Sequence, residues 1–171
     1  MRHTISVIVE NKFGVLARIA GLFSARGFNI ASLAVGETED PTTSRMTIVV
    51  EGDDKTLEQI KKQLNKLIDV IKVADFKDGE FIDREIILIK VAVSAKTRKE
   101  IIESVEAAGG TIENAGSKSL TVELAGDQNS IKTILELLRP FGILEVVRTG
   151  RIAMDISEKG LHGEGKPEVN E

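Results

Sequence analysis

Cysteine, tyrosine and tryptophan are absent from the 171 residues, and histidine occurs only twice. Without cysteine the chain has no disulfide framework, no thiolate zinc site and no cysteine nucleophile. The two histidines, His3 and His162, lie near opposite ends of the chain, which argues against a histidine metal site and against a histidine-based catalytic triad. Dinucleotide-binding, phosphate-loop, zinc-protease and serine-hydrolase motifs are also missing. The sequence therefore predicts no catalytic residues, no metal ligands and no cofactor in this chain.

Long apolar runs and an excess of positive charge are absent as well. No apolar run approaches the roughly 18 residues of a membrane-spanning helix, and residues 1–11 lack the apolar region of a secretory signal. We therefore expect a cytoplasmic protein with no membrane contact. The 23 basic and 27 acidic residues give a net charge of −4, and the aromatic residues are six phenylalanines. This composition argues against a nucleic-acid-binding surface.

Most of the net negative charge comes from the chain after residue 154, where five acidic residues accompany two basic ones. Residues 155–171 are rich in glycine and charge and poor in apolar side chains. Such a segment buries too little apolar surface to offset the entropy lost on ordering, so we expect it to be disordered.

Apolar spacing divides the rest of the chain into strands and helices. Helical spacing begins at Val15, and Gly27 is placed to end that helix. In the first half, strands are predicted over residues 4–9, 28–35, 45–51 and 70–76, with a second helix starting at 52–54. In the second half, strands are predicted over 85–93, 111–115, 119–125 and 143–148, with helices starting at Thr97 and Asp127.

Local signals mark one irregular strand and two helix starts. In residues 28–35 the apolar positions are first even-numbered and then odd-numbered, which predicts a β-bulge near Ala31–Ser32. Thr97 and Glu100 have the spacing of a capping box, and Asp127 is placed to cap the last helix.

Each half of the chain therefore has the element order βαββαβ. This order predicts an α+β protein of two tandem ferredoxin-like units, each with both helices on one face of an antiparallel four-stranded sheet. The expected domains are residues 1–76 and 84–154, joined by a linker over 77–83 and followed by the tail over 155–171.

The loop from Asn11 to Leu16 is the most suggestive of ligand binding, and the residues alone leave two interpretations. It leads from a strand directly into a helix, where free N–H groups and the positive end of the helix dipole can hold a carboxylate. Asn11 offers both a donor and an acceptor, and Gly14 allows a ligand to approach the backbone closely. In the alternative, Asn11 only caps the helix and Gly14 only forms a turn.

The second strand, residues 28–35, is expected at an edge of its sheet. An apolar edge strand without proline or lysine readily pairs with another strand. It can pair with its own copy in a second protomer and form a symmetric dimer, or its edge can be covered by the C-terminal half of the chain. Periodicity does not separate these two possibilities.

Several segments carry a resemblance to known families. Residues 11–16 (NKFGVL) and 26–30 (RGFNI) resemble the ACT domain, a small-molecule sensor of βαββαβ topology. Residues 40–48 (DPTTSRMTI), 63–70 (QLNKLIDV) and 84–90 (REIILIK) are similar to the regulatory small subunit of acetolactate synthase, also called acetohydroxyacid synthase. The resemblance is strong over residues 1–90 and looser to about residue 154.

This resemblance implies a non-catalytic subunit that binds the large catalytic subunit of acetolactate synthase. The large subunit carries thiamine diphosphate, Mg²⁺ and FAD, and joins pyruvate to a second 2-keto acid in branched-chain amino-acid biosynthesis. The small subunit raises that activity and confers feedback inhibition by L-valine. A free-standing amino-acid sensor with a different partner is the alternative. A hydrolase of acylphosphatase type is disfavoured, because the loop over residues 11–14 has no arginine.

The resemblance also implies an effector site at the interface of a homodimer. In the family, valine lies between two ACT domains. The matching positions here are Asn11, Gly14, Val15 and Leu16 from one protomer and Asn29 and Ile30 from the other. The edge strand that joins the protomers is expected to use Phe28, Ile30, Leu33 and Val35.

Overall fold

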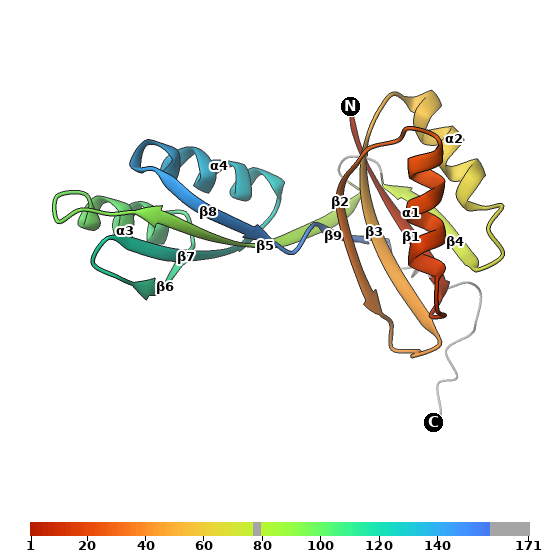
Figure 1. The fold of residues 1–171 in the computed structure, drawn as a ribbon, viewed down its shortest axis with the longest axis horizontal. Helices are drawn as coiled ribbons and strands as arrows, with labels where there is room; N and C mark the ends of the chain where they lie inside the picture. Colours follow the sequence, from red (N-terminus) through yellow and green to blue (C-terminus); the bar gives the residue numbers. More distant parts are fainter. Residues whose placement is uncertain (77–79, 158–171) are drawn as a thin grey trace. The chain divides into compact units, whose positions relative to one another are not determined.

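Two antiparallel sheets with accompanying helices make up the computed structural model (Figure 1). The structure describes residues 1–76 and 80–157. Unit 1 contains Met1–Ile82 and the chain from Ala153 onward, and unit 2 contains Asp83–Ile152. No helix within the described ranges is long and apolar enough to cross a membrane.

Unit 1 contains a four-stranded sheet with the order β2-β3-β1-β4. Its elements are β1 (Arg2–Glu10), α1 (Val15–Ala25), β2 (Ile30–Glu37), β3 (Thr43–Glu51), α2 (Asp54–Leu64) and β4 (Val70–Phe76). All three pairings are antiparallel, and β1 pairs with β3 from Arg2 opposite Glu51 to Glu10 opposite Thr43. The predicted ferredoxin-like topology is confirmed, and β2 lies at an edge of the sheet.

The core of unit 1 lies between the sheet and its two helices, which cover the same face in Figure 1. Alternate strand residues point toward the helices, because successive side chains of a strand face opposite sides of a sheet. The buried core consists of Ile5, Val7, Val9, Met46, Ile48 and Val50 from the strands, and Val15, Ile19, Leu22, Phe23, Leu57, Ile60 and Leu64 from the helices.

The opposite face of this sheet is buried too. Ser6 and Thr47, which point away from the helices, are 1 % and 3 % exposed. Arg45 on the same face donates from Nε to Ser6 Oγ (3.0 Å) and from Nη2 to the carbonyl oxygen of Ala153 (2.8 Å). Burial of the guanidinium lowers the pKa of Arg45. Ala153, at the point where the chain returns from unit 2, thus contacts the face of the first sheet that points away from the helices.

Unit 2 repeats the topology with the strand order β6-β7-β5-β8. Its elements are β5 (Phe81–Ala92), α3 (Arg98–Ala107), β6 (Thr111–Ala115), β7 (Ser119–Gly126), α4 (Gln128–Leu138), a short 3₁₀ turn (Arg139–Phe141) and β8 (Ile143–Arg148). Its core consists of Ile87, Ile89, Val91, Ile101, Val105, Leu120, Val122, Leu124, Ile131, Ile134 and Leu138. The second unit is therefore ferredoxin-like, as predicted.

The boundaries of unit 2 differ from those expected. β5 begins at Phe81, so residues 81–83 of the expected linker are strand. A strand that was not predicted, β9 (Ile152–Asp155), pairs with β5. The ring of Phe81 lies 5.1 Å from that of Phe76, centroid to centroid. Residues 77–79 of the expected linker and 158–171 of the expected tail lie outside the described residues.

The start of β2 also differs, although its predicted bulge is confirmed. The register of β2 against β3 shifts between Ile30 and Ser32. Phe28 precedes the strand, because its N–H group donates to the carbonyl of Phe23 (3.0 Å) in the turn that ends α1. Gly27 enables this turn with a φ of 68°. Phe28, expected in the edge strand, therefore belongs to the turn and packs edge-on against Phe23.

The two predicted helix caps have different outcomes. Asp127 caps α4 as predicted, since its Oδ1 accepts the N–H of Ser130 at 2.8 Å. The capping box at Thr97 and Glu100 is wrong. Thr97 Oγ1 instead accepts the N–H of Ser94 at 3.0 Å, in the turn before α3, and the Thr97 side chain makes no cap hydrogen bond.

Asp127→Ala is expected to lower the free energy of unfolding by about 1 kcal/mol, the usual effect of losing such a cap. The Ser130 N–H holds the pKa of Asp127 below its ordinary value of 3.8. The stabilisation is therefore complete above that ordinary value and is lost as the pH falls through the lowered pKa. Urea unfolding at pH 7 and at acidic pH measures both effects, with exposed Asn129→Ala as the control. An equal loss of stability in the two variants would contradict the cap.

Candidate effector site

The loop between β1 and α1 is held in the conformation that its glycine permits. Gly14 has a φ of 80°, which places it in the left-handed region that residues with a Cβ atom avoid. It occupies the N-cap position of α1 and supplies no capping side chain. Within the part of the chain that the structure describes, the N–H groups of Gly14 and Leu16 have no hydrogen-bond partner. These free donors at a helix N-terminus are suited to a carboxylate.

Asn11 anchors this loop to the β2–β3 connection. Its Nδ2 donates to Glu37 Oε1 (3.0 Å) and to the carbonyl of Pro41 (2.9 Å), and its backbone N–H donates to the carbonyl of Thr42 (2.7 Å). The interpretation of Asn11 as a helix cap is therefore wrong. Both amide hydrogens are already engaged, so Asn11 presents Oδ1 as an acceptor, rather than the donor and acceptor that were expected.

The β2–β3 connection that holds Asn11 is itself fixed by local hydrogen bonds. Asp40 Oδ1 accepts the N–H of Thr42 at 2.8 Å and its hydroxyl at 2.6 Å. The Thr42 hydroxyl, followed by the Thr42 N–H, lowers the pKa of Asp40. An Asp side chain that accepts the N–H two residues further on stabilises a turn of the backbone between them. The carbonyls of Pro41 and Thr42 are thus held where Asn11 needs them.

The remaining predicted site residues lie in two separate places. Val15 is 3 % exposed and packs in the core, so only its backbone can face a ligand, whereas Leu16 next to it is 44 % exposed. Asn29 is exposed and Ile30 half-buried at the start of β2. Glu37, which binds Asn11, ends that strand. At about 3.3 Å per residue, β2 separates these two groups by roughly 23 Å within one chain.

An ion pair beneath the loop was not anticipated from the sequence. Arg18 on α1 contacts Asp69 Oδ2 through Nε (2.9 Å) and Nη2 (2.7 Å). Asp69 precedes β4 and is 8 % exposed. The two residues are 51 positions apart, and neither stands in a motif that would have joined them. Only the fold brings them together.

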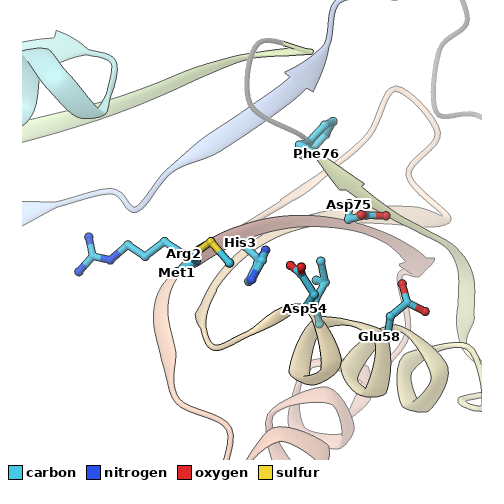
Figure 2. A pocket seen from close by; sticks show the side chains of 8 residues that line it. Met1, Arg2, His3, Asp54, Glu58, Asp75 and Phe76 are labelled. Atoms are coloured by element: carbon cyan, nitrogen blue, oxygen red, sulfur yellow. The ribbon is translucent and has the colours of Figure 1, made fainter.

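The hollow drawn in Figure 2 lies at the other end of unit 1. This groove of about 590 Å³ is lined by Met1, Arg2, His3, Asp54, Leu57, Glu58, Asp75 and Phe76. It starts where β1 begins, whereas the Asn11 loop follows the end of β1. The ring nitrogen Nε2 of His3 lies 3.2 Å from the carbonyl of Gly52, within hydrogen-bond distance. Among the described residues, no three His, Cys, Asp or Glu side chains are arranged to hold a metal ion.

Comparisons with known proteins show which families the two units resemble. Residues 5–72 match the family described as AHAS small subunit-like ACT domain, and residues 84–157 match the family described as small subunit of acetolactate synthase. Unit 1 is therefore an ACT domain, and the second match begins at the start of unit 2.

Relatives with known names cover nearly the whole chain. The probable acetolactate synthase small subunit of Archaeoglobus fulgidus is 50% identical over 90% of this chain and 96% of its own length. The acetolactate synthase small subunit of Mycobacterium bovis is 48% identical over 93% of this chain and 95% of its own. A crystal structure of the small subunit from Thermotoga maritima has a TM-score of 0.82 and 39% identity, covering 91% of this chain and 97% of that one. The chain belongs to the family of acetolactate synthase small subunits.

Gly14→Ala is expected to lower the free energy of unfolding by about 1–2 kcal/mol, because a residue with a Cβ is strained in the left-handed region. The new Cβ would also lie 3.3 Å from Arg18 Nη1. The control is Gly21→Ala within α1, where a Cβ meets no atom within 4 Å. There the change should stabilise by about 1 kcal/mol. Urea unfolding measures both, and shifts of the same sign would contradict the geometry assigned to Gly14.

Proposed function

We propose that this chain is the regulatory subunit of an acetolactate synthase, binds its large catalytic subunit and makes that enzyme sensitive to L-valine. Family membership supports the subunit role, because the relatives are named as small subunits. Such a name implies a larger, catalytic partner. The valine site is supported by the arrangement of β2 relative to the Asn11 loop.

The position of β2 is the observation that carries this proposal. One side of β2 pairs with β3, and its other side has no strand partner among the described residues. When a strand pairs antiparallel with its own copy about a two-fold axis through the middle of the strand, its first residue lies opposite the last residue of the copy. Ile30 of the second copy then lies opposite Glu37. Because Glu37 accepts a hydrogen bond from Asn11, the loop of one copy meets Asn29 and Ile30 of the other.

The resulting site has the chemistry of a branched-chain amino acid. The free N–H groups of Gly14 and Leu16 suit the carboxylate, and Asn11 Oδ1 accepts from the ammonium group. Leu16 and Ile30 of the second copy supply apolar contact for an isopropyl side chain. Hydrogen bonds to charged groups contribute about 1.5–3 kcal/mol each, so the loss of one is measurable.

A ligand held by both copies can act as a regulator. A ligand shifts an equilibrium only by its difference in affinity between two states. Valine that contacts the loop of one protomer and the edge strand of the other favours the dimer geometry in which both are aligned. The catalytic subunit bound to that dimer then responds to valine concentration.

Val35→Lys is expected to convert the dimer into a monomer. Val35 lies on β2 and is 46 % exposed, and lysine on an edge strand opposes strand pairing. The matched control is Ile71→Lys on β4, the other edge of the same sheet, where Ile71 is 52 % exposed. Sedimentation analysis gives the mass of each variant. Dissociation caused by the Ile71 change and not by the Val35 change would assign the interface to the wrong edge.

Calorimetric titration tests the effector site. The protein is expected to bind one L-valine per protomer and to discriminate against D-valine and L-lysine. Asn29→Ala should weaken binding at least tenfold, since about 1.4 kcal/mol corresponds to a factor of ten. Asn114→Ala, an exposed asparagine on β6 of unit 2, should leave binding unchanged. If L-valine binds neither the protein alone nor its mixture with the catalytic subunit, the proposed effector is wrong.

A further inference from the structure

We propose that Asp69 is a positioning residue of the effector site, which fixes the Asn11–Gly14 loop from beneath by holding the residues that flank it. This inference rests on the proposed function, because it concerns the same site. Asp69 lies outside the loop and outside β2.

The side chain of Asp69 holds the chain that follows the loop. Its Oδ2 accepts from Arg18 Nε at 2.9 Å and from Arg18 Nη2 at 2.7 Å. The backbone N–H of Arg18 in turn donates to the carbonyl of Gly14 at 3.0 Å, in the first turn of α1. Fixing Arg18 therefore fixes the helix turn whose free N–H groups face the ligand.

The backbone of Asp69 holds the chain that precedes the loop. Its carbonyl accepts the N–H of Glu10 at 2.9 Å, immediately before Asn11. Glu10 also bonds Lys12 Nζ at 2.7 Å through its own carboxylate, and this hydrogen bond raises the pKa of Lys12. One buried residue thus contacts both sides of a loop that itself contributes nothing to the core.

The carboxylate of the Arg18–Asp69 ion pair is more buried than the side chains of the exposed Arg2–Glu51 pair in the same unit. The Asp69 side chain is 11% exposed, whereas Arg2 and Glu51, paired at 2.9 Å, have side chains 56% and 51% exposed. Exposed pairs contribute little, because water and salt screen them. The buried carboxylate of Asp69 is screened less, so its ion pair restrains the position of Arg18 more strongly. A preorganised binding site requires such restrained residues.

The packing of Gly14 against Arg18 completes the arrangement. A Cβ at position 14 would lie 3.3 Å from Arg18 Nη1, the guanidinium nitrogen that does not contact Asp69 Oδ2. The guanidinium therefore lies directly beside the loop backbone while its other two nitrogens contact the carboxylate. A side chain at position 14 would therefore crowd the guanidinium that pairs with Asp69.

The test uses the full chain with Asp69→Ala. Arg18 is half-exposed and can be solvated once its partner is lost, so we expect the variant to fold. We expect L-valine binding at least tenfold weaker by calorimetry, whereas the control Glu51→Ala should bind as the unmodified protein does. Arg18→Lys, which keeps one charged donor, should bind more tightly than Arg18→Ala. The double variant Arg18→Ala with Asp69→Ala should bind no more weakly than the worse single variant.

Amide hydrogen exchange provides a readout that needs no ligand. Exchange at Arg18 should be faster in Asp69→Ala than in Glu51→Ala, because the turn that carries the Arg18–Gly14 hydrogen bond is less constrained. Unchanged exchange at Arg18 would overturn the inference, and so would additive effects of the two substitutions on valine binding. If the unmodified protein binds no valine but Asp69→Ala still accelerates this exchange, the proposed effector has failed while the positioning role stands.

Discussion

The side of β2 that has no strand partner among the described residues is the constraint on which the proposed regulatory role depends. An edge strand presents a row of N–H and C=O groups that pair with another strand or with water. The helices cover one face of the first sheet, and the buried residues Ser6 and Thr47 show that the other face is covered as well. The edges are thus the surfaces through which the sheet can extend. We infer that β2 extends it with a second copy of the chain.

The structure explains why one chain cannot form the proposed site by itself. Asn11 is tied to the end of β2 through Glu37, and Asn29 lies before its start. A two-fold axis through the middle of β2 removes this separation, because antiparallel pairing reverses the strand. In that arrangement dimer assembly creates the proposed site, and an effector binds to the dimer that is already formed. We infer that each protomer keeps its own part of the site rigid through the contacts of Asp69 and Arg18 beside the loop.

The sequence predicts those strands and helices whose buried residues recur at regular spacing. Alternation at Ile5, Val7 and Val9 and the change of parity in β2 gave the first strand and the bulge. Four-residue β9 has one buried residue, Ala153, and so leaves no periodic signal. Thr97 has the spacing of a helix cap, but its Oγ1 instead accepts a hydrogen bond from the N–H of Ser94. The predicted loop residues are found together, whereas the pairing of Arg18 with Asp69 depends on tertiary contact that no local pattern expresses.

The most direct measurement of the regulatory role is the rate of acetolactate formation by the purified catalytic subunit, titrated with this chain in the presence and absence of L-valine. We predict that the chain alone forms no acetolactate, that it raises the rate of the catalytic subunit to saturation at a fixed ratio, and that L-valine reverses this increase. A rate that stays constant at every ratio of the two proteins, with and without L-valine, would contradict the proposed function.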